Sequence, residues 1–561
     1  MYEVTCYHKS LGMFRGLSSF RRFLSSDRIV RSPLPDAQIP LATVHDFVYR
    51  HFDRYGDRTA IVDALTGQSY TYAQLGATTD RFASSLRRRG FNKGDALCIF
   101  LPNVPDYPIV YFGTTKAGGV ATTANPTYTS RELAYQLRDS KSKFLVTLPA
   151  FADVAKAAAN EAGTVEETIV VDTLTPGHVP SNTIGLSEFL NTDPVAATWP
   201  STGAANLKED VATLPYSSGT TGLPKGVMLS HYNLVANVSQ LVADRRLLQV
   251  TETDRVCMSL LPFFHIYGMI VTLARGLQQG STLVTLPKFE PDPFLKAIQD
   301  HRVTMLPIVP PLALFLAKHP DVCNYNFSNV VDIMIGAAPL SGDVTTTLYE
   351  RLGTECVRQA YGLTETSPLT HFCLRDRTRT GSVGFSVPNT ETKVIGTETG
   401  EALGALEAGE ICVRGPQVML GYLNNPEATA RTIDADGWLH TGDIGYHDKD
   451  EFLYVTDRLK ELIKVKGFQV APAELEGLLL THSDIVDAAV IGVPHKIAGE
   501  APRAFVVRRS GSTIGKSDVS EFVATSSAPH KHLAGGVEFV DAIPKSASGK
   551  ILRRYLRDRK D

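Results

Sequence analysis

The chain has 561 residues and a nearly balanced charge of −3 at pH 7, because 56 Lys and Arg residues face 59 Asp and Glu residues. Its length predicts about three to five folding units with a large buried core. The hydrophobic fraction of 43% and the charged fraction of 20% exclude a disordered or fibrous protein. The charge balance disfavours a nucleic-acid-binding protein, which would carry an excess of positive charge.

The first 41 residues are predicted to be an N-terminal extension. Basic side chains are interleaved there with Leu, Phe and Ser, while acidic ones are few: Lys9, Arg15, Arg21, Arg22, Arg28 and Arg31. A mitochondrial transit peptide and a solvated N-terminal tail are both compatible with this pattern.

Three further features bear on where the chain works. The seven cysteines are widely spaced and contain no CxxC pair, which predicts reduced thiols. No stretch approaches the ~20 apolar residues of a membrane-spanning helix. The C-terminus lacks the peroxisomal Ser-Lys-Leu signal. We therefore expect an intracellular protein, mitochondrial or cytoplasmic, with no transmembrane segment.

From residue 42 onward, helical segments alternate with short apolar runs. Strands are expected at Leu97–Leu101 and Phe144–Thr147, with a helix at Arg131–Ser140 between them. This alternation is typical of α/β layers with largely parallel sheets.

Glycine-punctuated short strands dominate between residues 383 and 455, and indicate a smaller β-rich subdomain. The pattern changes again after Asp457–Lys460, with a helix expected at Ala473–Leu480 and strands at Asp487–Ile491 and Ala504–Val507. We therefore predict an N-terminal domain over 42–456, a hinge at 457–460 and a C-terminal domain over 461–561.

The most specific motif is Tyr-Ser-Ser-Gly-Thr-Thr-Gly-Leu-Pro-Lys-Gly at 216–226. Its glycines allow backbone N–H groups to approach an anion, its hydroxyls can donate hydrogen bonds, and Lys225 adds positive charge. It is not a Walker A loop, because no Gly-Lys-Ser/Thr ends it. A polyphosphate-binding loop is predicted, with a flexible polar surface loop as the alternative.

Three later motifs each carry one group suited to a nucleotide. Glu365 follows Tyr-Gly-Leu-Thr and could bind a phosphate-bound magnesium. Asp443 ends Trp-Leu-His-Thr-Gly-Asp, where a tight turn is expected, and could accept hydrogen bonds from ribose hydroxyls. Lys550 ends Pro-Lys-Ser-Ala-Ser-Gly-Lys and could bring a movable charge to a phosphoryl group. Taken singly, each has an ordinary explanation as a capped helix start, a turn or a solvated lysine.

In this order and spacing, the four motifs resemble those of the acyl-adenylate-forming superfamily of acyl-CoA synthetases, firefly luciferases and peptide-synthetase adenylation domains. The resemblance runs from about Thr43 to Arg554, and the segments Leu101–Asn103 and Ala124–Pro126 are most similar to 4-coumarate:CoA ligases and their luciferase-like relatives. It implies an α/β fold, with a large N-terminal domain of two αβ layers plus a β-barrel and a small mobile α+β C-terminal domain.

The resemblance also implies ATP and CoA as co-substrates, Mg²⁺ as the metal and Glu365 as its ligand. Lys550 would be the adenylation lysine, and His265 would border the carboxylate site. The residues implied to bind ATP or AMP are Ser217, Ser218, Gly219, Thr220, Thr221, Lys225, Gln359, Thr364, Asp443, Arg458 and Lys550.

For the second half-reaction, Lys464 and Gln469 match a loop that replaces Lys550 at the site once the C-terminal domain has rotated about Lys460. The implied CoA contacts are Lys288, Lys466 and Gly467, and the implied acyl-site residues are Tyr267, Ala360, Lys460 and Lys464.

The resulting hypothesis is an ATP-dependent acid:CoA ligase. A carboxylate is a poor electrophile, so the acid is first joined to AMP, and the CoA thiol then displaces AMP. Three alternatives stay open: a luciferase-type oxygenase acting through the same adenylate, a module that loads a carrier-protein thiol, and a catalytically inactive nucleotide-binding protein.

The acid itself is less well defined. Plant 4-coumarate ligases usually have glycine where Ala360 stands, and the extra methyl group disfavours a plant-like hydroxycinnamate site. A hydroxycinnamate-like aryl acid and a medium- or long-chain fatty acid both remain candidates. The sequence does not indicate the oligomeric state.

Overall fold

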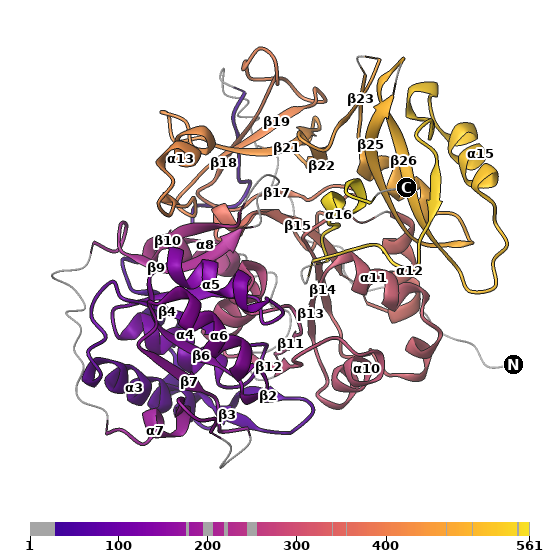
Figure 1. Cartoon of the computed structure of the whole chain (residues 1–561). Helices are drawn as coiled ribbons and strands as arrows, with labels where there is room; N and C mark the ends of the chain where they lie inside the picture. The colour runs from indigo at the N-terminus through magenta and orange to yellow at the C-terminus, as the bar shows by residue number, and fades with distance from the viewer. Residues whose placement is uncertain are drawn as a thin grey trace, which may run out of the picture.

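The computed structural model describes residues 28–559, apart from 175–178, 194–205, 218–222, 244–254, 339, 341, 355, 467, 496, 547 and 548. Four β-sheets and the helices packed on them make up the described part of the chain (Figure 1). Most of the basic N-terminal segment lies outside these residues.

The first sheet forms one αβ layer. In spatial order its strands are β20 (Gly421–Tyr422), β10 (Lys225–Ser230), β9 (Val211–Ser217), β5 (Val120–Thr123), β4 (Ala96–Phe100), β6 (Ser142–Thr147), β7 (Glu167–Val170) and β8 (Ile184–Gly185). In β4, Leu97 and Ile99 enter one hydrophobic core, while Cys98 and Phe100 enter a second core on the other face. A parallel strand buried on both faces needs a continuous apolar run, which explains this segment of the sequence.

The second sheet forms the other αβ layer. Its strands are β17 (Phe385–Ser386), β16 (Leu369–Phe372), β15 (Val357–Gly362), β14 (Asp332–Ile335), β13 (Met305–Ile308), β11 (Val256–Ser259), β12 (Thr282–Thr285), β2 (Thr59–Asp63) and β3 (Ser69–Thr71). The strands from β2 to β15 pair in parallel, whereas β16 and β17 add antiparallel pairs at one edge. The main core extends from this sheet into the first layer.

The third sheet accounts for the β-rich stretch expected between residues 383 and 455. It contains β1 (Val30–Arg31), β18 (Glu391–Ile395), β19 (Gly409–Arg414), β21 (Leu439–His447) and β22 (Leu453–Arg458), all antiparallel. Figure 1 shows β18, β19 and β21 above the two αβ layers.

The fourth sheet lies in the C-terminal part of the chain, drawn in yellow and orange in Figure 1. Its strands are β24 (Phe468–Val470), β23 (Ile463–Val465), β26 (Gly499–Arg508), β25 (Ile485–His495) and β27 (Val537–Phe539). In β25, Ala488 and Val490 enter one core and Ala489 and Ile491 enter another. Both cores consist of residues from 463 onward, so this part has hydrophobic cores of its own.

The helices cover the faces of these sheets. Their bounds are α1 (Val44–Tyr49), α2 (Phe52–Tyr55), α3 (Tyr72–Arg88), α4 (Tyr107–Lys116), α5 (Ser130–Asp139), α6 (Ala152–Ala162), α7 (Leu186–Leu190), α8 (His231–Ala243), η4 (Tyr267–Ala274), α9 (Arg275–Gln278), α10 (Pro291–Asp300), α11 (Pro310–Lys318), α12 (Gly342–Leu352), α13 (Pro426–Thr432), α14 (Pro472–Leu480), α15 (Lys516–Ser526) and α16 (Arg553–Arg557). Short turns of 3₁₀-helix occur at η1 (Pro149–Phe151), η5 (Pro320–Asn324), η6 (Thr364–Thr366) and η7 (Pro529–Lys531). No helix in the described part of the chain is long and apolar enough to cross a membrane.

The α/β fold class with a small C-terminal α+β unit is confirmed. The expected helix at Arg131–Ser140 is α5, displaced by one residue, and the expected strands Asp487–Ile491 and Ala504–Val507 lie within β25 and β26. The domain limits and the hinge at 457–460 remain predictions, with β22 ending at Arg458 inside the proposed hinge.

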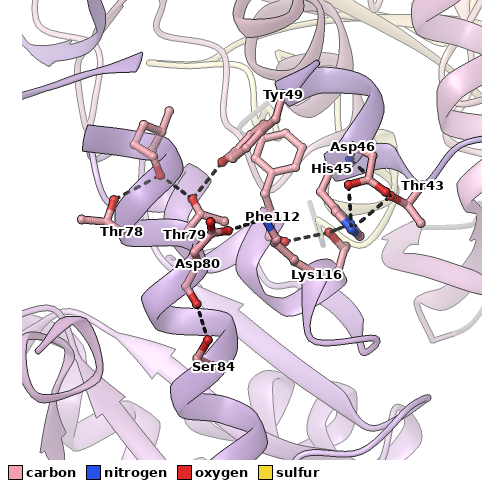
Figure 2. A network of polar contacts seen from close by, with 12 residues as sticks. Thr43, His45, Asp46, Tyr49, Thr78, Thr79, Asp80, Ser84, Phe112 and Lys116 are labelled. Atoms are coloured by element: carbon pink, nitrogen blue, oxygen red, sulfur yellow. Dashed lines mark hydrogen bonds and ion pairs between the residues drawn. The ribbon is translucent and has the colours of Figure 1, made fainter. Parts of the chain in front are cut away.

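Two buried histidines connect α1 with α4 and α8. The ring nitrogens of His45 lie 3.0 Å from Thr43 Oγ1 and 3.2 Å from Thr115 Oγ1, and Figure 2 shows His45 beside Thr43 and Asp46. His231 Nδ1 accepts the Val44 N–H at 3.1 Å. Burial lowers the pKa of His45 well below its usual value and that of His231 to about 4, so both rings are neutral near pH 7.

This arrangement predicts that acid destabilises the fold. In the unfolded chain a histidine has a pKa of about 6.5, whereas folded His231 has a pKa of about 4. Between these two pH values the unfolded state therefore binds one more proton than the folded state at this residue. The free energy of unfolding should fall by up to about 1.4 kcal/mol per pH unit for each such histidine. Urea unfolding at several pH values between 7 and 4 measures this slope.

His231→Asn keeps an acceptor for the Val44 N–H and should make the slope shallower by about one proton. Gln299→Asn, at an exposed position in α10, changes no titratable group and is the control, which should leave the slope unchanged. An unchanged slope in His231→Asn would contradict the prediction.

Candidate active site

The predicted phosphate loop connects two paired strands. Lys225 at the start of β10 pairs with Ser217 at the end of β9, so the connecting segment begins and ends at one point of the first sheet. Ser218, Gly219, Thr220 and Thr221 lie outside the described residues. Both described ends of the motif therefore lie at the same end of the β9–β10 pair, where a connecting loop can contact a ligand.

A tyrosine links this hairpin to the predicted magnesium ligand. Tyr422 in β20 pairs with β10, and its hydroxyl donates to Glu365 Oε1 at 2.9 Å. Lys225 Nζ lies 4.7 Å from the centre of the same ring. Burial and the Glu365 charge raise the pKa of Tyr422, which keeps its hydroxyl a donor. Tyr422 thus holds together the cation and the carboxylate that were singled out from separate motifs.

Asp443 lies within β21 rather than in a turn, which corrects the expectation from the sequence. Asp443 pairs in antiparallel fashion with Arg458 in β22, so the Thr-Gly-Asp segment forms part of the sheet. Asp443 Oδ1 lies 3.0 Å from Arg458 Nε, and Oδ2 accepts the Tyr361 hydroxyl at 2.7 Å. Only 4% of the Asp443 surface is exposed, so its carboxylate is held in one orientation.

Lys550 reaches the same cluster from the C-terminal part of the chain. Burial, together with the positive charge of Arg458, lowers its pKa to about 8, while Asp443 and Glu461 act in the opposite direction. The adjacent Gly549 has φ +79°, and a Cβ atom there would lie 3.2–3.3 Å from Val309 and Pro311 at the start of α11. The loop therefore packs closely on the second αβ layer and brings Lys550 beside Asp443.

His265 lies close enough to Lys550 for their charges to interact. Burial, and then the Lys550 charge, lowers the pKa of His265 to about 4. Its Nδ1 accepts the Tyr267 N–H at 3.3 Å, which makes Nε2 the protonated nitrogen of the neutral ring. His265 can therefore offer one N–H donor to an anionic group.

The remaining N-terminal candidates lie on or next to β15. Gln359 Oε1 accepts the Leu340 N–H at 3.0 Å, Ala360 is 8% exposed, and Thr364 begins the η6 turn that also carries Glu365. The Tyr267 hydroxyl donates to the Met334 carbonyl at 3.1 Å, so its ring is fixed beside the same sheet.

A second group of candidates is exposed. Lys464 in β23 pairs with Gln469 in β24, and both face solvent, as do Lys460 and Lys466. Lys288 is also exposed and forms an ion pair with Glu290 at 2.6 Å. Gly467 lies outside the described residues. The structure thus brings Lys550, but not this exposed group, into the buried cluster around Asp443.

Sequence reasoning did not identify the ion pair that anchors the Lys550 segment. Arg553 Nη2 lies 2.7 Å from both oxygens of Glu476, and its Nε donates to the Val490 carbonyl at 3.2 Å. The side chains are 13% and 10% exposed. The only sequence signal was the presence of Arg553 three residues after Lys550, with Glu476 in a predicted helix.

Two family models match the chain. Residues 48–423 match the AMP-binding enzyme family, and residues 474–550 match the AMP-binding enzyme C-terminal domain.

Individual proteins match over nearly the whole chain. A 4-coumarate–CoA ligase of Vanilla planifolia is 42% identical over 543 residues, covering 95% of this chain and 96% of the relative. The crystal structure of ATP-bound MatB from Rhodopseudomonas palustris is 32% identical with a TM-score of 0.80, covering 92% of this chain and 98% of that one. The o-succinylbenzoate CoA synthetase MenE from Bacillus subtilis, in complex with its acyl-adenylate intermediate, is 28% identical with a TM-score of 0.77, covering 92% and 98%.

The Arg553–Glu476 pair gives a prediction about stability. Removal of one partner of a buried pair leaves an unpaired buried charge, which costs about 3–5 kcal/mol. Arg553→Ala should therefore lower the hydrogen-exchange protection of β25 and β26 by about that amount. Arg559→Ala is the control, because its pair with Glu538 spans 3.5 Å and half of its side chain is exposed; a loss below about 1 kcal/mol is expected there. Unchanged protection in Arg553→Ala would contradict the anchoring role.

Proposed function

Because this chain belongs to the AMP-binding enzyme family, we propose that the cluster around Lys550 and Asp443 is the site where it joins an acid to AMP. The chain is an ATP-dependent acid:CoA ligase of the 4-coumarate–CoA ligase type and forms an acyl-adenylate. The observation that carries the site assignment is the half-buried lysine from the C-terminal part, positioned beside the buried Asp443 and Arg458.

The first half-reaction is attack by the acid carboxylate on the α-phosphorus of ATP, with loss of pyrophosphate. The barrier is mainly electrostatic, because the anionic carboxylate must approach an anionic triphosphate and negative charge builds up on the pyrophosphate that leaves. Lys550 and Lys225 would neutralise this charge, and Thr364 would donate its hydroxyl to the α-phosphate. Asp443 would accept from the ribose hydroxyls, and the Nε2–H of His265 would orient the acid carboxylate.

Glu365 fits a magnesium ligand. It is a buried carboxylate beside the phosphate hairpin, and one of its oxygens is fixed by the Tyr422 hydroxyl. Mg²⁺ bound there would supply positive charge for the phosphates. Tyr422 would keep Glu365 and Lys225 at a constant separation while the nucleotide binds.

The second half-reaction is attack by the CoA thiol on the acyl carbon, with AMP as the leaving group. The exposed β23–β24 hairpin carries Lys464, Lys466 and Gln469, which would reach the site after the C-terminal domain rotates about Lys460. Lys288 and Gly467 would then contact CoA. Rotation moves Lys550 away, which opens a path for the pantetheine arm.

The acid is proposed to carry an apolar tail that packs against Tyr267 and Ala360. A hydroxycinnamate-like aryl acid is the first candidate, because the 42% identical relative is named a 4-coumarate–CoA ligase. A medium- or long-chain fatty acid is the second candidate, because the methyl group of the buried Ala360 would narrow the proposed acyl site at β15.

The Lys550 assignment predicts a separation of the two half-reactions. Lys550→Ala should lose at least about a hundredfold in pyrophosphate release, since one transition-state charge contact is worth that much, yet convert supplied acyl-AMP and CoA to the thioester at near-normal rate. Pyrophosphate release and thioester formation are measured separately. An equal loss in both steps would contradict the assignment.

The pKa of Lys550 predicts how the adenylation rate depends on pH if the assignment is correct. The amine is charged below about pH 8 and loses its charge as pH rises through that value, so kcat/KM for ATP should fall above about pH 8. Lys550→Arg stays charged, and its lower rate should not show this alkaline decline. A decline of the same shape in Lys550→Arg would assign the titration to another group.

The acid preference can be tested at β15. Ala360→Gly removes one methyl group from the proposed acyl wall, which should raise kcat/KM for hydroxycinnamates about tenfold relative to alkyl acids. Acyl-CoA formation from a panel of aryl and alkyl acids gives this ratio. Ala162→Gly, at the last residue of α6 in the first αβ layer, is the control and should leave the ratio unchanged.

A further inference from the structure

Three metal-ligating side chains share one face of the third sheet. Glu410 and Cys412 are two residues apart in β19, so both point to the same face. His440 in β21 is the direct cross-strand partner of Cys412. Antiparallel pairing therefore brings a carboxylate, a thiol and an imidazole together outside the nucleotide cluster.

The distances suit a tetrahedral ion. His440 Nδ1 lies 3.0 Å from Glu410 Oε2 and 3.7 Å from Cys412 Sγ, and one atom from each of the three residues lies within 4.8 Å of the others. Around a zinc ion with ligand bonds of about 2.0–2.3 Å, neighbouring ligand atoms are about 3.3–3.7 Å apart. Two of the three separations are thus within about 0.3 Å of this range or inside it, and the third, between Glu410 and Cys412, is at most 4.8 Å.

The second ring nitrogen of His440 faces another carboxylate. Asp434 Oδ2 lies 3.6 Å from His440 Nε2. Metal-binding histidines commonly donate their other N–H to a carboxylate, which fixes the ring orientation and increases the basicity of the ligating nitrogen. Asp434 lies just beyond hydrogen-bond distance of this nitrogen and would take this role after a small approach.

We propose that Glu410, Cys412 and His440 bind a zinc-class divalent cation, with Asp434 as the orienting partner and a fourth position completed by water. The exposed fractions of the His440 and Glu410 side chains, 29% and 15%, give the ion a route from solvent. A sulfur and nitrogen ligand set selects zinc, cobalt or cadmium over Mg²⁺, which prefers six oxygen ligands.

Binding releases a proton. A cysteine binds a metal ion as the thiolate, so the new sulfur–metal bond replaces the S–H bond of Cys412 and one proton is lost to solvent.

The site is coupled to the proposed ribose carboxylate. Glu410 Oε1 accepts the Gly442 N–H at 3.0 Å, one residue before Asp443. A cation on Oε2 draws electron density from Oε1 and weakens the hydrogen bond from Gly442. The backbone that carries Asp443 is then held less firmly, so KM for ATP should rise when the ion is bound. This coupling rests on the role proposed for Asp443, whereas the binding itself does not.

Cobalt(II) titration of the full chain tests the binding. The expected result is a saturable sulfur-to-cobalt charge-transfer band, lost in Cys412→Ser and weakened about tenfold or more in apparent affinity by Asp434→Asn. Cys323→Ser, at an exposed cysteine, is the matched control and should retain the band. Acyl-CoA synthesis without added cobalt or zinc should be normal in Cys412→Ser, which establishes that this variant is folded.

Two results would overturn the site. The first is no cobalt band in the active full chain, and the second is a band that persists in Cys412→Ser. The coupling is measured separately as KM for ATP with and without zinc. A bound ion that leaves KM unchanged would overturn the link to Asp443 while the binding site stands.

Discussion

The proposed adenylation site depends on the charge of Lys550, which must be kept although burial removes much of the side chain from water. Burial and Arg458 together lower the pKa of Lys550 to about 8, and the nearby carboxylates of Asp443 and Glu461 act in the opposite direction. A charge in a low-dielectric setting acts far more strongly on a phosphate than the same charge in water. In the proposed site, Asp443 supplies part of the opposing negative charge, and its contacts with Tyr361 and Arg458 hold that carboxylate in one orientation.

Because Lys550 comes from the C-terminal part, its position depends on how that part is built. The two faces of β25 enter two separate cores, and Arg553 ties the segment after Lys550 to Glu476 in α14. A unit with its own cores can change its contacts with a neighbour without unfolding. The packing of Gly549 on Val309 and Pro311 sets the position of Lys550 in the arrangement seen here.

Local patterns predicted the elements well but not the contacts between them. The apolar run at Leu97–Leu101 indicated a buried strand because β4 is covered on both faces. Thr-Gly-Asp suggested a turn, yet the pairing of β21 with β22 places Asp443 in a strand. The role of Tyr422 arises from pairing between β20 and β10, which are distant in the sequence, so no local signal could have revealed its contact with Glu365.

The two faces of the third sheet explain how the proposed nucleotide site and the proposed metal site can share strands. Side chains alternate along β19, so Ile411 and Val413 enter the core on which Tyr361 packs, while Cys412 lies with Trp438 on the opposite face. In β21 the two side chains have different neighbours: His440 lies beside Cys412, whereas Asp443 accepts the Tyr361 hydroxyl. An ion at Cys412 would thus leave the nucleotide untouched, and its effect would pass through the Glu410 hydrogen bond to Gly442, within the backbone that carries Asp443.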